Sequence, residues 1–298
     1  MNTRTRFRRA TGAVAAVAMA AGVLAACAPT SSASAPASHA ADAGLHMISN
    51  DGHRLAFHVT PGHRPAVVLD AGGGNDSTYW KKLVPVLSQR TGAEIITYDR
   101  AGMGKSDRVP GPYGNKDAAS DLEAGLKALE VSHDAVLVSH SQAGEVATNL
   151  VNEYPGSVSG AVLVDASLPQ FYSTDEIARI VSANAPKIAA LKKHKPTKAS
   201  RQLIAMAKNY APAHRRYAQL SWPASVPAIA VVSASTPYPA GLDARRWRDA
   251  QAKFVNAASN RRLVTAAHSS HDVPIDRPGL VVRQTREMLG RVGRPNGS

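Results

Sequence analysis

The stretch Ser139-His140-Ser141-Gln142-Ala143-Gly144 decides the fold that we predict for this chain. It stands between an apolar run, residues 135–138, and a helix-like run, residues 145–154, so its context is strand, sharp turn, helix. Ser141 has a small residue two positions before it and another two positions after it, which lets the backbone turn tightly enough to expose the serine hydroxyl. Gly144 supplies a further small residue for close packing of the helix. The pattern predicts an exposed nucleophilic serine.

Short apolar runs alternate with helix-like runs on both sides of this turn. Two runs near the start, residues 45–48 and 55–59, are joined by the turn signal Asn50-Asp51-Gly52, which predicts a hairpin. The other candidate strands are residues 66–69, 94–98, 161–164, 228–232 and 263–266, and the other candidate helices are residues 78–88, 116–129, 243–258 and 278–289. This alternation predicts an α/β fold with a mostly parallel central sheet and helices on both faces. Catalytic groups are then expected at the carboxyl ends of the strands.

The alternation stops between about Pro169 and Pro223. Helix-period stretches rich in lysine and arginine, residues 175–191 and 199–210, occupy this segment. We interpret residues 169–223 as a helical cap inserted after the strand that follows the serine turn. Residues 44–168 and 224–292 then form the core.

The first 26 residues have the pattern of an export signal. Four arginines, at positions 4, 6, 8 and 9, precede an apolar run, residues 13–26, that is too short for a comfortable membrane span. The run ends Leu24-Ala25-Ala26-Cys27, which resembles the bacterial lipobox, in which the cysteine is lipidated. Cys27 is the only cysteine of the chain and cannot form an internal disulfide. An ordinary signal, cleaved near residues 31–41, is the alternative.

Residues 27–43 are rich in serine, alanine and proline and are predicted to be a flexible tether. We therefore expect an exported lipoprotein of the bacterial cell envelope, anchored to a membrane through Cys27, or a secreted protein if the lipobox is not used. The membrane is the partner that this anchor implies. The sequence leaves the oligomeric state open.

The composition is that of a folded protein, with 44% hydrophobic and 19% charged residues in a chain of 298 residues. The formal net charge is +13, and the chain stays basic without the arginines of the signal. Such a charge either favours anionic lipid headgroups or envelope polymers as partners or simply keeps the protein soluble. Nucleic acid is not expected as a partner, because the basic residues are scattered rather than interleaved with aromatic residues.

Five motifs occur in an order that resembles the α/β-hydrolase family, over a stretch that runs from about Leu45 to the last helix. They are Ala71-Gly72-Gly73-Gly74 with Trp80, the run from Tyr98 to Asp107, the turn at Ser141, Val164-Asp165-Ala166-Ser167, and Ser269-Ser270-His271-Asp272 with Asp276-Arg277-Pro278. The resemblance implies an α/β-hydrolase fold and the esterase-like chemistry of its serine hydrolases. The serine at position 141 argues against the branches of the family that use aspartate there.

A serine hydroxyl needs a base to accept its proton as it attacks, and histidine serves well near neutral pH. His140 is adjacent to Ser141, where the turn directs its side chain away, and His268 lies too close to the end of the last strand. His271 lies in a loop of small residues between the last strand and the last helix. The resemblance places the catalytic base in this loop, so we predict that His271 is the base.

The third residue should be a carboxylate that orients the imidazole and stabilises its charged form. In much of the family the acid follows the strand that here ends at Val232, but the next residues, 233–236, include no carboxylate. Asp165, at the end of the strand after the serine turn, occupies a second position used in the family. Asp243 is the alternative. A purely structural role at the strand end is the other interpretation of Asp165.

The resemblance implies that the backbone N–H groups of Gly73 and Gln142 form the oxyanion hole. Family members often have a histidine before the glycine turn, where this chain has Ala71, so the support of that loop is an open question. The family role of Asp99, Arg100 and Asp107 is mostly structural.

These observations predict a serine hydrolase that cleaves a small-molecule carboxylic ester through an acyl-enzyme. Amide, lactone and carbon–carbon bond cleavage remain open, and so does a non-catalytic binding lipoprotein that keeps the fold. We expect no cofactor, because Gly104-Lys105-Ser106 lacks the earlier glycine of a phosphate-binding loop. We expect no metal either, because the histidines near the start of the domain lack the paired spacing of a zinc site.

Overall fold

The computed structural model of the chain describes residues 43–109, 113–238 and 240–293. The predicted export signal, Cys27 and nearly all of the predicted tether lie outside the described residues. Among the helices that are described, none combines the length and the apolar character needed to cross a membrane.

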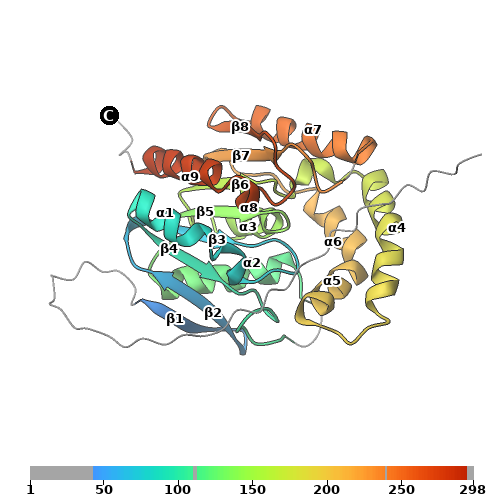
Figure 1. The fold of residues 1–298 in the computed structure, drawn as a ribbon, viewed down its shortest axis with the longest axis horizontal. Helices are drawn as coiled ribbons and strands as arrows, with labels where there is room; N and C mark the ends of the chain where they lie inside the picture. The colour runs from blue at the N-terminus through green and yellow to red at the C-terminus, as the bar shows by residue number, and fades with distance from the viewer. Residues whose placement is uncertain (1–42, 110–112, 239, 294–298) are drawn as a thin grey trace, which may run out of the picture. The chain divides into compact units, whose positions relative to one another are not determined.

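The described residues form one eight-stranded sheet with the strand order β1-β2-β4-β3-β5-β6-β7-β8 (Figure 1). The strands are β1 (Gly44–Asn50), β2 (His53–Thr60), β3 (His63–Asp70), β4 (Ala93–Tyr98), β5 (Ala135–His140), β6 (Gly160–Val164), β7 (Ala228–Ser233) and β8 (Arg261–Ala266). The β1–β2 and β2–β4 pairs are antiparallel, and every other pair is parallel.

The interior strands form where the sequence has short, fully apolar runs. Every residue of β4, β5, β6 and β7 is buried, as expected for parallel strands covered on both faces. Strands β5, β6, β7 and β8 are consecutive neighbours, so their carboxyl ends lie along one edge of the sheet. Ser141 follows β5 at this edge, Asp165 follows β6, and Ser233 is the last residue of β7. The loop that carries His271 follows β8 at the same edge.

Helices cover both faces of the sheet. On one face, α1 (Leu83–Thr91) and α9 (Pro278–Val292) pack through leucine, valine and methionine side chains. On the other face lie α2 (Asn115–Ala128), α3 (Ala143–Glu153) and α7 (Leu242–Asn256). The predicted fold class, a mostly parallel sheet with helices on both faces, is confirmed.

The segment predicted as the cap contains a short 3₁₀-helix at Pro169–Phe171 and the helices α4 (Thr174–Leu191), α5 (Lys198–Lys208) and α6 (Tyr210–Tyr217). These helices gather to the right of the sheet in Figure 1. Helix α6 was not expected as a separate element, because the helical period of the sequence continues through Asn209, the residue at which α5 ends and α6 begins. Two further short helices, Ser77–Trp80 and α8 (Val273–Asp276), also lie where a longer helix or a loop was expected.

Candidate active site

Ser141 stands in the turn between β5 and α3, as its sequence context predicts. Its φ of 56° lies in the left-handed region, which costs energy for any residue with a Cβ and is common at functional turns. The backbone hydrogen bonds of Ser141 to Val164 and Ser167 hold the turn in place, at 3.1 and 2.9 Å. At Gly144 a Cβ would lie 2.6 Å from the carbonyl oxygen of Ser167, so a small residue is needed there for α3 to pack. The turn is therefore held in its strained form by the elements around it.

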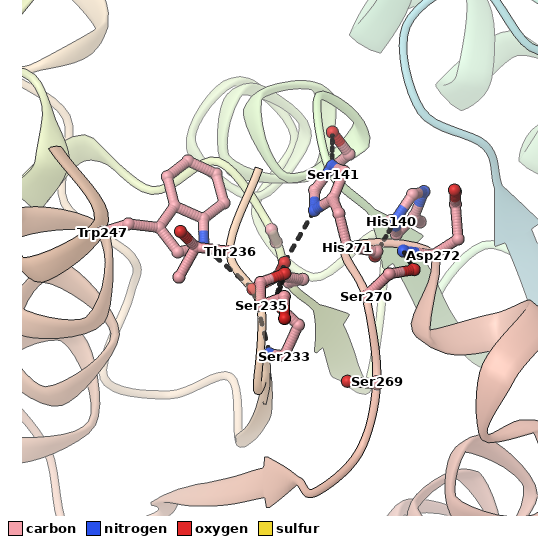
Figure 2. Close-up of polar contacts among 12 residues, drawn as sticks. His140, Ser141, Ser233, Ser235, Thr236, Trp247, Ser269, Ser270, His271 and Asp272 are labelled. Atoms are coloured by element: carbon pink, nitrogen blue, oxygen red, sulfur yellow. Dashed lines mark hydrogen bonds and ion pairs between the residues drawn. The ribbon is translucent and has the colours of Figure 1, made fainter. Parts of the chain in front are cut away.

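The imidazole of His271 lies between the side chains of Ser141 and Asp165. Figure 2 shows His271 beside Ser141. Its Nε2 is 2.8 Å from the Ser141 Oγ, and its Nδ1 is 2.6 Å from the Asp165 Oδ2. Because an ionised carboxylate only accepts, Nδ1 carries the proton and Nε2 is free to accept one from the hydroxyl. The structure thus brings together the three residues that the sequence singled out as nucleophile, base and acid.

Asp165 is fully buried and receives four hydrogen bonds in all. Besides His271, the Ser233 hydroxyl donates to Oδ2 at 2.6 Å, the Ser233 N–H donates to Oδ1 at 3.2 Å, and the Trp247 indole N–H donates to Oδ1 at 2.8 Å. Burial alone would raise the pKa of the Asp165 carboxyl, but the hydrogen bonds from His271, Ser233 and Trp247 outweigh it and hold the pKa below its usual range. Asp165 is therefore a carboxylate at neutral pH.

The two alternatives from the sequence lie elsewhere. Asp243 accepts a hydrogen bond at 2.9 Å from Arg179 of α4, and the side chain of His268 is exposed. Ser233 is the last residue of β7 and the first of the residues without a carboxylate, and its side chain donates a hydrogen bond to Asp165 at the end of the neighbouring strand β6. The carboxylate that contacts His271 therefore stands at the end of β6 rather than at the end of β7, which is the departure from the family pattern.

The glycine turn after β3 lies against the serine turn. A Cβ at Gly72 would be 3.1 Å from the Ser141 Cβ, so the two loops are in contact. Within the described part of the chain, no hydrogen bond engages the backbone N–H groups of Gly73 and Gln142. These two donors are available to an oxygen atom that carries negative charge beside Ser141.

Arg100 provides the support for this loop that the sequence left open. Its guanidinium is buried, pairs with Asp70, and donates to the carbonyl oxygens of Ala71 and Gly72, the latter at 2.7 Å. From the cap, the Gln202 side chain accepts a hydrogen bond from the Gly74 N–H at 2.6 Å. The loop is therefore held in place by Arg100 of the core and by Gln202 of α5.

Arg100→Met is expected to lower the free energy of unfolding by about 3–5 kcal/mol, because it leaves the carboxylate of Asp70 buried without its cation. The double variant Arg100→Met, Asp70→Asn should lose less, since no charge is then left unpaired. Arg54→Met, which breaks the solvent-exposed pair with Asp107, is the matched control and should have little effect. Urea unfolding of the variants measures these differences. Equal losses in the single and double variants would contradict this account of the pair.

His140 supports the loop that carries His271. Its ring is fully buried and stacks on Tyr79 with 5.1 Å between centroids, and its Nε2–H donates to the backbone carbonyl of His271 at 2.9 Å (Figure 2). Burial and the nearby charge of His271 lower the pKa of His140 to about 4. His140 is therefore neutral where His271 is to act as a base, and it adds no positive charge beside that imidazole.

Stability should fall at mildly acid pH because of His140. An unfolded histidine takes up a proton near pH 6.5, whereas the folded one resists protonation until about pH 4, so folding is weakened as the pH falls between these values. From pH 7 to pH 5 the wild-type free energy of unfolding should drop by about 2 kcal/mol more than that of His140→Gln. Urea unfolding at several pH values measures the slope, with His268→Gln at an exposed position as the control. Parallel slopes for wild type and His140→Gln would be inconsistent with this prediction.

A cavity of about 190 Å³ lies between core and cap, beside Gln142. Its walls include Asn115 and Glu145 from the core and Met206, Tyr210 and His214 from the cap. Gln142, which follows Ser141 in the serine turn, contributes to the cavity wall.

A buried polar network forms one wall of this cavity. The Gln142 side chain donates to Asn115 at 3.0 Å, Asn115 donates to Glu145, and Glu145 also accepts from Tyr172 at 3.1 Å and His214 at 3.2 Å. Burial opposes the charge on His214, but the Glu145 carboxylate outweighs it and raises the pKa of that imidazole. The network ties the helix that follows the serine to α6 of the cap.

Sequence reasoning missed several residues that position this site. Trp247 lies in a helix that is mostly polar and shares it with one other large aromatic residue, Phe254; its aromatic character is the available signal. The ring centroid of Trp247 lies 6.2 Å from that of His271. The contact of Arg100 with the glycine turn and that of Tyr79 with His140 had no signal in the sequence, because they join segments that are far apart along the chain. Among the residues described, no cluster of three or more histidine, cysteine or acidic side chains is arranged to hold a metal.

Comparison with known proteins confirms the predicted α/β-hydrolase fold. Residues 65–191 match the model of the family described as alpha/beta hydrolase fold. An esterase from Exiguobacterium antarcticum superposes with a TM-score of 0.62 over 84% of this chain and 100% of that chain, at 15% sequence identity. At this identity the likeness shows the fold alone.

Two curated relatives match part of the chain. The uncharacterized protein YqjL of Bacillus subtilis is 36% identical over 119 residues, which are 38% of this chain and 45% of that protein. A cis-3-alkyl-4-alkyloxetan-2-one decarboxylase of Shewanella oneidensis is 28% identical over 123 residues, 40% of this chain and 38% of that protein. The chain thus spans less than half the length of each of these relatives.

Proposed function

We propose that this chain, which has the α/β-hydrolase fold, is a serine hydrolase that cleaves a carboxylic ester through an acyl-enzyme. One observation carries the proposal: a continuous pair of hydrogen bonds runs from the Ser141 hydroxyl through the His271 imidazole to the buried Asp165 carboxylate. This arrangement can deprotonate an alcohol at neutral pH and hold the resulting imidazolium.

In the first half of the reaction, the Ser141 Oγ attacks the ester carbonyl carbon while its proton moves to the His271 Nε2. The Asp165 carboxylate stabilises the imidazolium that forms. The carbonyl oxygen becomes an oxyanion and accepts hydrogen bonds from the N–H groups of Gly73 and Gln142. When the tetrahedral intermediate collapses, His271 gives its proton to the leaving alcohol oxygen.

In the second half, water attacks the acyl-enzyme and passes one proton to His271. The second tetrahedral intermediate releases the carboxylic acid and restores the Ser141 hydroxyl with the proton from His271. The ester and one water molecule therefore give one acid and one alcohol. Every proton that is transferred in these reaction steps passes through the His271 Nε2.

An ester is the substrate that we propose because an alcohol oxygen is a better leaving group than an amide nitrogen or a carbon, and His271 can protonate it as it leaves. The protein of similar fold from Exiguobacterium antarcticum is described as an esterase, and the partial relative from Shewanella oneidensis is described as a decarboxylase of an oxetanone. Both descriptions apply to proteins whose substrates bear a carbonyl group, which agrees with an oxyanion hole at Gly73 and Gln142.

Hydrolysis of p-nitrophenyl esters by the purified protein tests the proposal. We expect turnover by the wild type, loss of turnover in His271→Ala, and retained turnover in His268→Ala, the matched control with an exposed histidine. No turnover of any ester by the wild type, or equal activity in both variants, would exclude the proposed role of His271.

We also propose that the protein is exported and anchored to a membrane through a lipid on Cys27. The arginine-rich start, the apolar run and Leu24-Ala25-Ala26-Cys27 support this proposal. Incorporation of an alkyne-labelled fatty acid in growing cells tests it: the label is expected on the wild type and should be absent from Cys27→Ser. Label retained in Cys27→Ser would show that the cysteine is not the anchor.

A further inference from the structure

A second concave surface lies within the cap, between α4 and α5. Its volume is about 500 Å³, within the range of small-molecule sites. We call it the cap groove and define it by six of its apolar lining residues, which are Val181, Ala185, Ile188, Leu203, Ile204 and Ala207. Val181 is 41% exposed, which is high for a valine on a folded protein. The groove is a candidate site for an apolar ligand.

Lysines surround this apolar lining. Lys187, Lys192 and Lys208 line the cap groove and have exposed side chains, and within the described part of the chain none of them pairs with an acid. The whole stretch from residue 177 to residue 242 contains ten lysines and arginines and no aspartate or glutamate. A ligand of the groove therefore meets positive charge at the edge of an apolar surface.

We propose that the cap groove binds a single-chain anionic amphiphile, with its alkyl chain on the apolar lining and its carboxylate head at the lysines. The alkyl chain is favoured because it removes apolar side chains from water, and the head is favoured because residues 177–242, which include all the lining residues of the groove, contain no acid to oppose it. A nucleic acid would leave the apolar lining uncovered. A neutral alkane-like ligand would leave the lysines unused.

The cap groove adjoins the cavity beside Gln142. Met206 and Tyr210 line both spaces, and the Met206 Cε lies 3.6 Å from the position of a Cβ built on Gly73. If the proposed function holds, hydrolysis of an ester with a long acyl chain produces an alkyl carboxylate next to this groove. The groove would then bind the long acyl chain of the ester substrate or the carboxylic acid that is released from it. This assignment of the ligand rests on the proposed function.

Binding is tested with the full chain carrying Ser141→Ala, titrated calorimetrically with dodecanoate below its critical micelle concentration. We expect saturation at one site. Decanoate, which lacks two methylenes, should bind about fifteenfold more weakly, at about fourfold per methylene. Dodecanol, which lacks the charge, should also bind about tenfold more weakly.

Two sets of variants identify the site. The triple change Lys187→Gln, Lys192→Gln, Lys208→Gln should weaken dodecanoate binding about tenfold. The matched control, Lys81→Gln, Lys82→Gln, Lys253→Gln, removes the same charge from exposed positions of the core and should leave binding unchanged. Ala207→Trp, which fills the groove, should abolish saturation, and its melting temperature shows whether the fold is kept.

Three results would overturn the proposal: no saturation by dodecanoate, equal affinity for dodecanol, or equal weakening by the two triple variants. The groove would instead be assigned to a second copy of the chain by two results together. The Ser141→Ala chain would not bind dodecanoate, and adding Ala207→Trp would make it sediment more slowly. Because Ser141→Ala lacks the nucleophile, binding and hydrolysis are measured separately. A chain that binds dodecanoate but cleaves no ester would refute the proposed function and keep the groove.

Discussion

Ser141→Ala is expected to lower kcat for ester hydrolysis by at least about 10⁴-fold, because removal of the nucleophile leaves only binding and the oxyanion donors. The hydroxyl is the atom that lies 2.8 Å from His271, and no other described hydroxyl contacts that Nε2. Initial rates on a p-nitrophenyl ester at saturating substrate give kcat directly. A loss of less than about tenfold would show that the reaction does not pass through this oxygen.

A pair of variants at the same position separates catalysis from folding. Ser141→Gly should be more stable than Ser141→Ala by about 1 kcal/mol, because alanine keeps the Cβ that is strained at positive φ. The φ of 56° at this residue is the basis of the comparison. Both variants lack the hydroxyl, so both should be inactive. A glycine variant less stable than the alanine variant in urea unfolding would contradict the strain at this turn.

Asp165→Asn should lower kcat by about 10⁴-fold, because an amide no longer holds the Nδ1 proton of His271 or stabilises the imidazolium. The pKa of Asp165 is held low, so the wild type has the carboxylate throughout the neutral range. The amide also brings two protons toward Ser233 and Trp247, which already donate to this side chain. We therefore expect a lower melting temperature as well.

Asp243→Asn is the matched control for Asp165→Asn. It makes the same chemical change at the other candidate acid, whose contact is with Arg179 rather than with His271. Its kcat should stay within a few-fold of the wild type. Large losses in Asp243→Asn with small losses in Asp165→Asn would reverse the assignment of the acid.

The fold was predictable from the sequence because its strands are short apolar runs that end in turn residues. Runs such as residues 135–138 and 161–164 need burial on both faces, and only a sheet between two layers of helices provides it. The division of the cap was harder to predict. Asn209 caps both the end of α5 and the start of α6, and Pro212 has no N–H for the carbonyl of Lys208, so α5 cannot continue through it. Tyr217 and His214 hold α6 against the core.

The candidate site was predictable where local sequence determines the geometry. A serine between small residues after a strand, and a histidine in a loop before the last helix, are local patterns. The acid was less certain, because which strand end faces the imidazole depends on the pairing of β6 with β7. The sequence alone does not fix that pairing, and Asp165 and Asp243 therefore both remained candidates.

The supporting residues could not be predicted, because their contacts are made across the sheet and between layers. Arg100 reaches back to the loop after β3, and Trp247 reaches from α7 to the end of β6. Periodicity shows which face of an element is buried but not which atom of a distant element it meets. Such contacts follow from tertiary packing.

Labelling with a fluorophosphonate probe, followed by mass spectrometric mapping of the modified peptide, tests the central claim most directly. The account predicts a single adduct on the Ser141 Oγ, formed by the wild type and strongly reduced in His271→Ala. The absence of an adduct, or an adduct on another serine that persists in Ser141→Ala, would contradict it.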